Sequence, residues 1–355
     1  MKKKIRKNKN MSKEICAVDL FCGAGGLTRG LINSGINVVA GIDSDPTCEY
    51  PYEHNNGAEF LQRDIFDIEA ADVSKLFGKS EIRLLAGCAP CQPFSTYSRK
   101  GRVERNNADW SLVDRFGKLV AEIQPELVAM ENVPSLARHE VFTDFLKHLD
   151  GYHVWWKVVE CSEIGVPQTR KRLVLLASRF GEADLSIESG DTPVSTVRST
   201  IGRLSKLSAG DADPNDILHI ASRLSKVNLE RIRASKPGGT WRDWDPDLRA
   251  ACHIKSTGST YPSVYGRMEW DSPAPTITTQ SFGYGNGRFG HPEQDRAITL
   301  REAAMLQTFP KEYAFVASVG EVRFSQLGRL IGNAVPVRLG EAIGEAFARH
   351  LVSAG

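Results

Sequence analysis

Several features that would assign this chain to a special class are missing from its 355 residues. No apolar run approaches the roughly 18 residues that a membrane span needs, and the N-terminus shows no signal peptide. The seven cysteines are odd in number and scattered, so a disulfide framework is not expected. Internal repeats and low-complexity tracts are also lacking. We therefore expect a cytoplasmic globular protein with reduced thiols, long enough for two domains.

Charge is nearly balanced overall but unevenly placed. The formal net charge is +2, whereas the first thirteen residues carry seven Lys/Arg and no acid, which leaves −5 on the rest. We interpret residues 1–13 as a basic disordered tail, either a solubilising end or a nucleic-acid arm. Between residues 195 and 270, twelve Lys/Arg accompany eight Asp/Glu, with aromatic residues interleaved. This mixture suits a nucleic-acid surface, and an irregular structural domain is the alternative.

The functional interpretation of the sequence centres on residues 83–95, RLLAGCAPCQPFS. Its apolar run 84–86 predicts a buried strand, which ends at Gly87 in a proline-rich turn that holds Cys91. Open α/β sheets present reactive groups at this carboxyl edge, and a thiolate is reactive near neutral pH, so Cys91 is a candidate nucleophile. Three alternatives stay open here: a redox pair with Cys88, half of a zinc site that no second Cys/His pair completes, or a buried apolar residue.

A glycine-rich turn lies near the start of the chain. An apolar strand over residues 15–21 leads into the turn 22–26, CGAGG, and a helix over 27–33 follows. This order lets backbone N–H groups cradle a ligand. The turn lacks the third spaced glycine of the dinucleotide fingerprint, which disfavours NAD. A second strand, 36–42, ends at Asp43, where an acid can bind a ribose diol; a turn or capping role is the alternative.

Other polar residues lie next to predicted strands. One apolar strand runs straight into Glu131. Because a carboxylate there is costly to desolvate, it more often has a functional role than a purely structural one. Arg170 and Arg172 precede another strand at alternate positions, so they point the same way and suit a planar or anionic ligand. Asp64 and Ile65 follow a loop, where they either contact an adenine amino group or start a turn.

Six motifs together carry a family resemblance. They are DLFCGAGG at 19–26, GCAPCQPFS at 87–95, ENV at 131–133, QTRKR at 168–172, REAAMLQTFP at 301–310 and GNAVPV at 332–337. In this order the chain resembles the cytosine-C5 DNA methyltransferases of bacterial or phage modification type. The resemblance implies an α/β fold with a Rossmann-like S-adenosylmethionine-dependent methyltransferase domain and a smaller, irregular target-recognition domain. We expect the first at 14–185, the second at 186–295, and a C-terminal return to the first over 296–355.

The resemblance also implies roles for single residues. Cys91 would be the nucleophile, Glu131 the acid at N3 of the base, Arg172 the group that holds O2, and Arg170 a support for a phosphate or a loop. Cys88 would then be a bystander. S-adenosylmethionine is the expected cofactor, without a metal. The residues implied to bind it are Phe21, Gly23, Gly25, Gly26, Leu27, Asp43, Ser44, Asp64, Ile65, Gly87, Pro93, Asn333 and Ala334.

The function implied is that of a sequence-specific DNA (cytosine-5-)-methyltransferase. It would transfer a methyl group from S-adenosylmethionine to C5 of a flipped-out cytosine through a covalent bond between the cysteine and C6. Duplex DNA is the expected partner, alongside a cognate restriction endonuclease that acts separately; we expect a monomer and no membrane. A tRNA cytosine-C5 methyltransferase is the alternative, and the long, centrally basic region 173–300 favours DNA.

Overall fold

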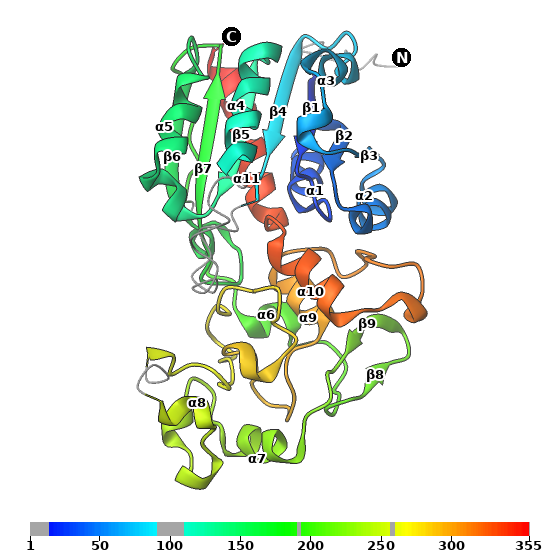
Figure 1. The fold of residues 1–355 in the computed structure, drawn as a ribbon, viewed down its shortest axis with the longest axis vertical. Coiled ribbons are helices and arrows are strands. Elements are labelled where there is room, and N and C mark those ends of the chain that lie inside the picture. The colour runs from blue at the N-terminus through cyan, green and yellow to red at the C-terminus, as the bar shows by residue number, and fades with distance from the viewer. Residues whose placement is uncertain (1–13, 91–109, 190–192, 256–259, 355) are drawn as a thin grey trace, which may run out of the picture.

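The structure is a computed structural model that describes residues 14–90, 110–189, 193–255 and 260–354. These residues form two lobes, an upper one built on a β-sheet and a lower one with little regular structure (Figure 1). The predicted tail and two predicted site residues, Cys91 and Pro93, lie outside the described residues.

A seven-stranded sheet in the order β3-β2-β1-β4-β5-β7-β6 organises the upper lobe. β7 is antiparallel to both of its neighbours, and the other paired strands are parallel. The chain runs from β1 outward to β3 and then returns to β4 on the other side of β1, so the strand order reverses between β1 and β4. Open sheets bind ligands at such a reversal. The strands are β1 (Ile15–Leu20), β2 (Asn37–Asp43), β3 (Glu59–Gln62), β4 (Ile82–Gly87), β5 (Leu127–Asn132), β6 (His153–Glu160) and β7 (Lys171–Ser178).

Helices cover both faces of this sheet. Successive residues of a strand point to opposite faces, and in the central strands the residues on both faces are apolar, so both faces must be buried. One face packs against α1 (Gly26–Asn33) and α11 (Val337–Ala354), and the other against α3 (Ala70–Leu76), α4 (Trp110–Ile123) and α5 (Glu140–Lys147). A further helix, α2 (Glu49–Asn56), adjoins β3.

Two helices far apart in the sequence, α1 and α11, cross closely. A Cβ on Gly30 would lie only 2.3 Å from the carbonyl oxygen of Val337, so the crossing requires glycine there. The C-terminal helix thereby returns to the upper lobe (Figure 1).

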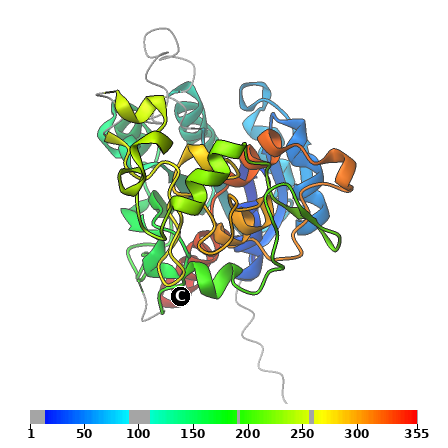
Figure 2. The ribbon, with the colours of Figure 1, turned by 90° about the horizontal axis from the view of Figure 1, so that it is seen from below.

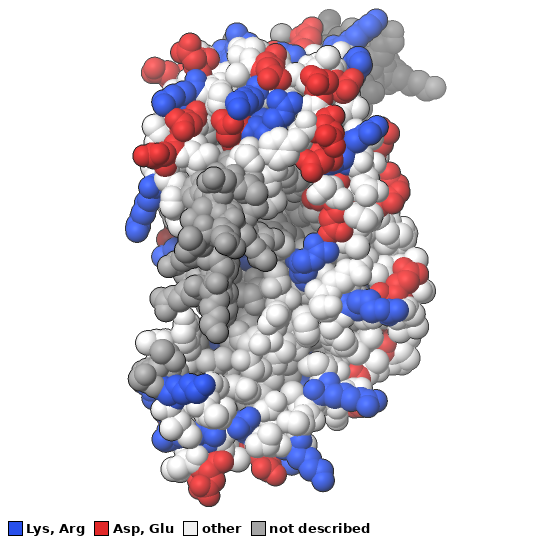
Figure 3. Space-filling model, in the orientation of Figure 1, with Lys and Arg blue, Asp and Glu red and all other residues white. Residues whose placement is uncertain are grey.

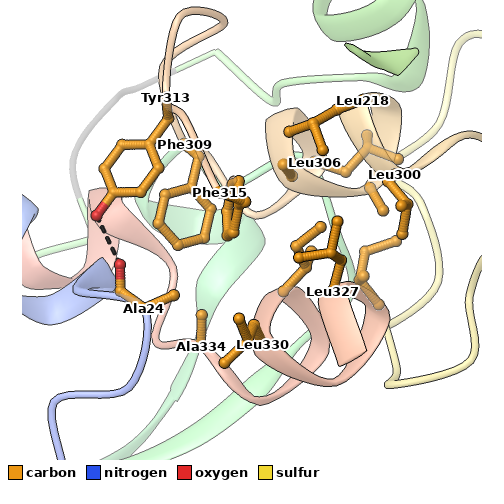
Figure 4. Close-up of a cluster of buried hydrophobic side chains, with 14 of the residues drawn as sticks. Ala24, Leu218, Leu300, Leu306, Phe309, Tyr313, Phe315, Leu327, Leu330 and Ala334 are labelled. Carbon is orange, nitrogen blue, oxygen red and sulfur yellow. Dashed lines mark hydrogen bonds between the residues drawn. The ribbon is translucent and has the colours of Figure 1, made fainter. Parts of the chain in front are cut away.

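The lower lobe consists of short elements and lies across the lower edge of the sheet when viewed from below (Figure 2). A buried apolar cluster joins it to the glycine turn (Figure 4). There the Tyr313 hydroxyl donates a hydrogen bond of 2.6 Å to the carbonyl oxygen of Ala24. The helices and strands between residues 197 and 333 are α6 (Val197–Ile201), β8 (Ala212–Asp213), β9 (Asp216–Ile220), α7 (Lys226–Ala234), α8 (Ala251–Ile254), α9 (Leu300–Leu306) and α10 (Phe324–Asn333).

The predicted Rossmann-like α/β class is confirmed, and the strands and helix predicted around the glycine turn lie within two residues of their expected bounds. Two details differ. Glu131 is inside β5 instead of following it, and Arg172 is inside β7. Both strands continue past their apolar runs because neighbouring strands still pair with them at the sheet edge. The domain limits at 185 and 295 stay predictions.

Candidate active site

One edge of the sheet gathers six of the predicted site residues that the structure describes. The carboxyl ends of the parallel strands β1 to β5 meet there, and antiparallel β7 reaches the same edge with its first residues. This edge faces the lower lobe (Figure 1). The space-filling view shows the molecule hollowed between the lobes (Figure 3). The residues at this edge are Phe21, Asp43, Asp64, Gly87, Glu131 and Arg172.

A buried ion pair is the chemical centre of this edge. Glu131 is only 2% exposed, and its Oε1 lies 2.7 Å from Nε of Arg172. Glu131 is paired in the sheet with Val174, so Arg172, two residues away on the antiparallel strand, points to the same face. A carboxylate this buried needs such a partner. The pair leaves a carboxyl and a guanidinium side by side, a combination that can hold a planar polar ring.

A second contact to the same carboxylate was not expected. The thiol of Cys88 donates a hydrogen bond of 2.6 Å to Oε2 of Glu131. Cys88 is therefore in contact with the central acid, whereas the sequence suggested a bystander. No sequence pattern predicts this contact, because it depends on the pairing of β4 with β5.

The Arg170 side chain is enclosed by backbone carbonyl groups. It is buried and donates hydrogen bonds to the carbonyl oxygens of Ile277, Gly332 and Ala334, at 3.0, 3.2 and 3.4 Å. The role of Arg170 as a support for a phosphate or a loop stays a prediction. Burial and the neighbouring charge of Arg172 lower the pKa of Arg170 to about 9, which still leaves it charged at neutral pH. Arg170 thus connects the sheet edge to the lower lobe and to the end of α10.

The glycine turn and Asp43 form one unit. The carboxylate of Asp43 accepts hydrogen bonds from the backbone N–H of Gly23 and of Asp45, each 3.0 Å long. Burial raises the pKa of Asp43. Gly25 and Gly26 also pack against protein: a Cβ on Gly26 would lie 2.2 Å from the Val335 carbonyl oxygen. The turn is therefore fixed by β2, the Tyr313 segment and the residues that precede α11.

Asp19 is a buried acid that the sequence reasoning did not assign. It is fully buried near the end of β1, and its Oδ2 accepts a 2.7 Å hydrogen bond from the Thr28 hydroxyl. Oδ1 is buried without a hydrogen-bond partner among the described residues. Burial raises the pKa of Asp19 to about 7. The signal that could have found it is an acid placed inside an otherwise apolar strand.

The raised pKa of Asp19 makes stability depend on pH. The unfolded chain loses this proton near pH 4 and the folded protein near pH 7, so the unliganded protein loses stability as pH rises through that window, with no further change above it. Relative to wild type, Asp19→Asn should gain about 3 kcal/mol of unfolding free energy between pH 5 and pH 8. Urea unfolding across this range measures the gain. Exposed Asp67→Asn is the control; parallel wild-type and Asp19→Asn curves would contradict the prediction.

The remaining predicted cofactor residues are placed as follows. The side chain of Leu27 packs in the core beneath α11, so only its backbone is available to a ligand. Asp64 caps a short turn, because its side chain accepts a 3.0 Å hydrogen bond from the backbone N–H of Phe66. This is the turn-starting role that was one of its two predicted roles. Ile65 is buried. Ser44 and Asn333 are exposed. Their contacts with a cofactor stay predictions, as does that of Ala334.

Two observations show that this edge suits the expected cofactor. Gly23 has a left-handed backbone (φ +53°), and a Cβ there would meet no atom within 4 Å, so space is open above the turn. The unpartnered Oδ1 of Asp19 lies at the end of the adjoining strand. Open space above a turn that is held by the Asp43 carboxylate suits a ligand that carries amino and hydroxyl donors, as S-adenosylmethionine does.

Other kinds of site are lacking from the described parts of the chain. They contain no cluster of three or more His, Cys, Asp or Glu residues able to hold a metal, and none of their helices is long and apolar enough to cross a membrane. The six cysteines within the described ranges are free thiols.

The lower lobe contains an aromatic cluster bordered by arginines. The rings of Trp241 and His253 stack with centroids 4.5 Å apart, and Tyr265 meets His253 edge-on. Arg242 and Arg249 lie over the Trp241 ring at 5.5 and 5.9 Å. Aromatic and basic residues that are interleaved in the sequence thus pack together as one cluster in the lower lobe.

The sheet order and the glycine turn are consistent with the Rossmann-like fold of S-adenosylmethionine-dependent methyltransferases. Within that class, residues 15–349 match the family model described as C-5 cytosine-specific DNA methylase. The chain belongs to this family and is a DNA cytosine-5-methyltransferase, as its six motifs predicted.

Similar proteins agree with this assignment. The chain is 50% identical over 341 residues to the Type II methylase M.HgiDII of Herpetosiphon aurantiacus, covering 94% of this chain and 95% of that one. It is 30% identical to the Type II methyltransferase M1.HphI of Haemophilus parahaemolyticus, covering 93% and 85%. A crystal structure from E. coli, described as a DNA modification methyltransferase encoded within a prophage, shares the fold with a TM-score of 0.75 at 20% identity, covering 96% and 100%.

Proposed function

We propose that this protein is the modification enzyme of a Type II restriction–modification system. It would transfer a methyl group to C5 of one cytosine within a specific duplex DNA sequence. Similarity to M.HgiDII over nearly the whole of both chains supports the Type II assignment. A separately acting restriction endonuclease, a monomeric enzyme and a cytoplasmic location belong to the same proposal. The tRNA alternative is not favoured, because the matching family model and the curated relatives cited above are those of DNA enzymes.

The observation that carries the proposed mechanism is the ion pair of Glu131 with Arg172 at the sheet edge. Cytosine presents N3 and O2 next to each other on one edge of its ring. A carboxyl beside a guanidinium matches this edge when the carboxyl is protonated, with Glu131 at N3 and Arg172 at O2.

The reaction then depends on Cys91, which follows β4. Its thiolate forms a bond to C6, and electron density moves toward C5. Glu131 donates its proton to N3, where negative charge develops. When bound, S-adenosylmethionine supplies an electrophilic methyl group. After C5 is methylated, a base removes the C5 proton, the electron pair reforms the C5–C6 double bond, the thiolate leaves, and N3 returns its proton to Glu131. The base is unassigned, and bound water could fill the role.

Cofactor binding and target access complete the proposal. Phe21, Gly23 and Asp43 would hold the cofactor at the point where the strand order reverses. C6 is out of reach of a side chain in stacked DNA, so the cytosine must leave the helix to enter the edge of the sheet. Residues 186–295 would contact the duplex, for which their interleaved basic and aromatic residues are suited.

Labelling of nucleic acids tests this function. The purified protein would receive methyl-labelled S-adenosylmethionine with unmethylated duplex DNA or unmodified tRNA, and the labelled nucleoside would be identified after digestion. We expect 5-methyldeoxycytidine from DNA, and bisulfite sequencing would then give the target site. Label as 5-methylcytidine in tRNA, or no label in either substrate, would contradict the proposal.

A further inference from the structure

We propose that Cys88 is a positioning residue that fixes the orientation of the Glu131 carboxylate. This inference rests on the proposed function, in which Glu131 acts on the substrate base. Its basis is the 2.6 Å hydrogen bond from the Cys88 thiol to Oε2, on the opposite side of the carboxylate from the 2.7 Å contact of Oε1 with Arg172. The carboxylate is thus held at both oxygens.

Three adjacent strands build this arrangement. Gly87 of β4 is paired with Met130 of β5, so the next residues, Cys88 and Glu131, lie side by side. The backbone N–H of Cys88 donates to the Leu20 carbonyl oxygen at 3.3 Å, which keeps Cys88 in register beyond the end of β4. Residues that precede Glu131 at alternate positions in β5 face the layer of α1 and α11, and Cys88 packs against that same layer.

The chemistry of the contact suits a donor and not a second nucleophile. A thiolate facing the Glu131 carboxylate would be repelled by its charge, whereas a neutral thiol can donate its proton to Oε2. The single bond to the carboxyl group allows it to rotate, and one anchor at Arg172 does not fix the direction of Oε2. Oε1 faces Arg172, so Oε2 is the oxygen that would carry the proton to the base while it accepts the Cys88 hydrogen bond. Cys88 therefore sets the direction from which Glu131 approaches N3.

Alanine and serine at position 88 test this role. We expect Cys88→Ala to lower kcat about tenfold, the low end for a hydrogen bond to a charged group, with KM for DNA and for S-adenosylmethionine within about twofold. Cys88→Ser keeps a donor and should recover most of the loss. Cys16→Ala is the matched control, because it removes a buried thiol from the opposite end of the same sheet. An unchanged kcat in Cys88→Ala, or equal losses in the serine and alanine variants, would overturn the inference.

An infrared measurement tests the hydrogen bond without relying on activity. A difference spectrum of wild type minus Cys88→Ala isolates the S–H stretching band of Cys88, and a donated hydrogen bond lowers its frequency. We expect this band to move when the same difference is taken in a Glu131→Gln background. A band at the frequency of a free thiol, unaffected by Glu131→Gln, would exclude the contact. Failure of wild type to methylate DNA would instead contradict the proposed function and leave the infrared result valid.

Discussion

Methyl transfer is expected to fall below detection when Cys91 is replaced by alanine. In the proposed mechanism this thiolate forms the bond to C6 that makes C5 nucleophilic, and alanine has no group that can form this bond. Removing a nucleophile typically costs about 10⁵-fold or more in kcat. Transfer of labelled methyl groups to duplex DNA measures the loss, and binding of S-adenosylmethionine should stay close to that of wild type.

A covalent trap separates this role from a structural one. DNA with 5-fluorocytosine at the target carries fluorine where the C5 proton must leave, and fluorine cannot depart as a cation. Wild type should therefore remain bonded to the DNA and migrate with it on a denaturing gel, whereas Cys91→Ala should not. Cys88→Ala, the closest matched cysteine change, should still form the adduct. Loss of the adduct in both variants to the same extent would argue against Cys91 as the nucleophile and revive the redox pair.

The second large effect is expected for Glu131→Gln. Glutamine matches glutamate in shape, and its amide oxygen can still accept a hydrogen bond from Arg172, so the fold should be retained. It can donate a hydrogen bond to N3 but cannot transfer a proton, and we expect kcat to fall by about 10²- to 10⁴-fold, the range for general acid catalysis. Single-turnover methylation of duplex DNA measures the effect, and thermal unfolding checks the fold.

The matched control for this change is Glu126→Gln. Glu126 also pairs with an arginine, Arg83, at 2.9 Å, but it immediately precedes β5 and so lies at the end of that strand away from Glu131. Its replacement should leave kcat near the wild-type value. If both glutamine variants methylate DNA at the wild-type rate, Glu131 does not donate the proton.

Local sequence patterns predicted most of the catalytic lobe. The strand into the glycine turn, the second strand ending at Asp43 and the strand into Gly87 are short apolar runs bounded by turn residues, a pattern that neighbouring residues are enough to produce. The short strand β3 and the helices α2 and α3 were not predicted. β3 has four residues, of which Phe60 alone is buried. So short a segment with one buried residue has no apolar pattern from which a strand could be predicted.

Two arginines in one motif show where local reasoning stops. Arg170 and Arg172 are alike in type and near each other in sequence, yet Arg172 reaches Glu131 whereas Arg170 is enclosed by carbonyl groups from residues 277, 332 and 334. Those carbonyls come from segments more than a hundred residues away. Their position depends on how the lower lobe and α10 pack, which residues 168–172 alone cannot specify.

By itself the sequence determined the family, the α/β class and the identity of the candidate nucleophile and acid, because these depend on residue types in a fixed order. The tertiary structure alone decided which groups touch the acid. Cys88, Glu131 and Arg172 come from three strands, and the pairing of those strands brings a thiol and a guanidinium to the two oxygens of one carboxylate. Strand register is a property of the folded sheet, so contacts across it cannot be found by reading along the chain.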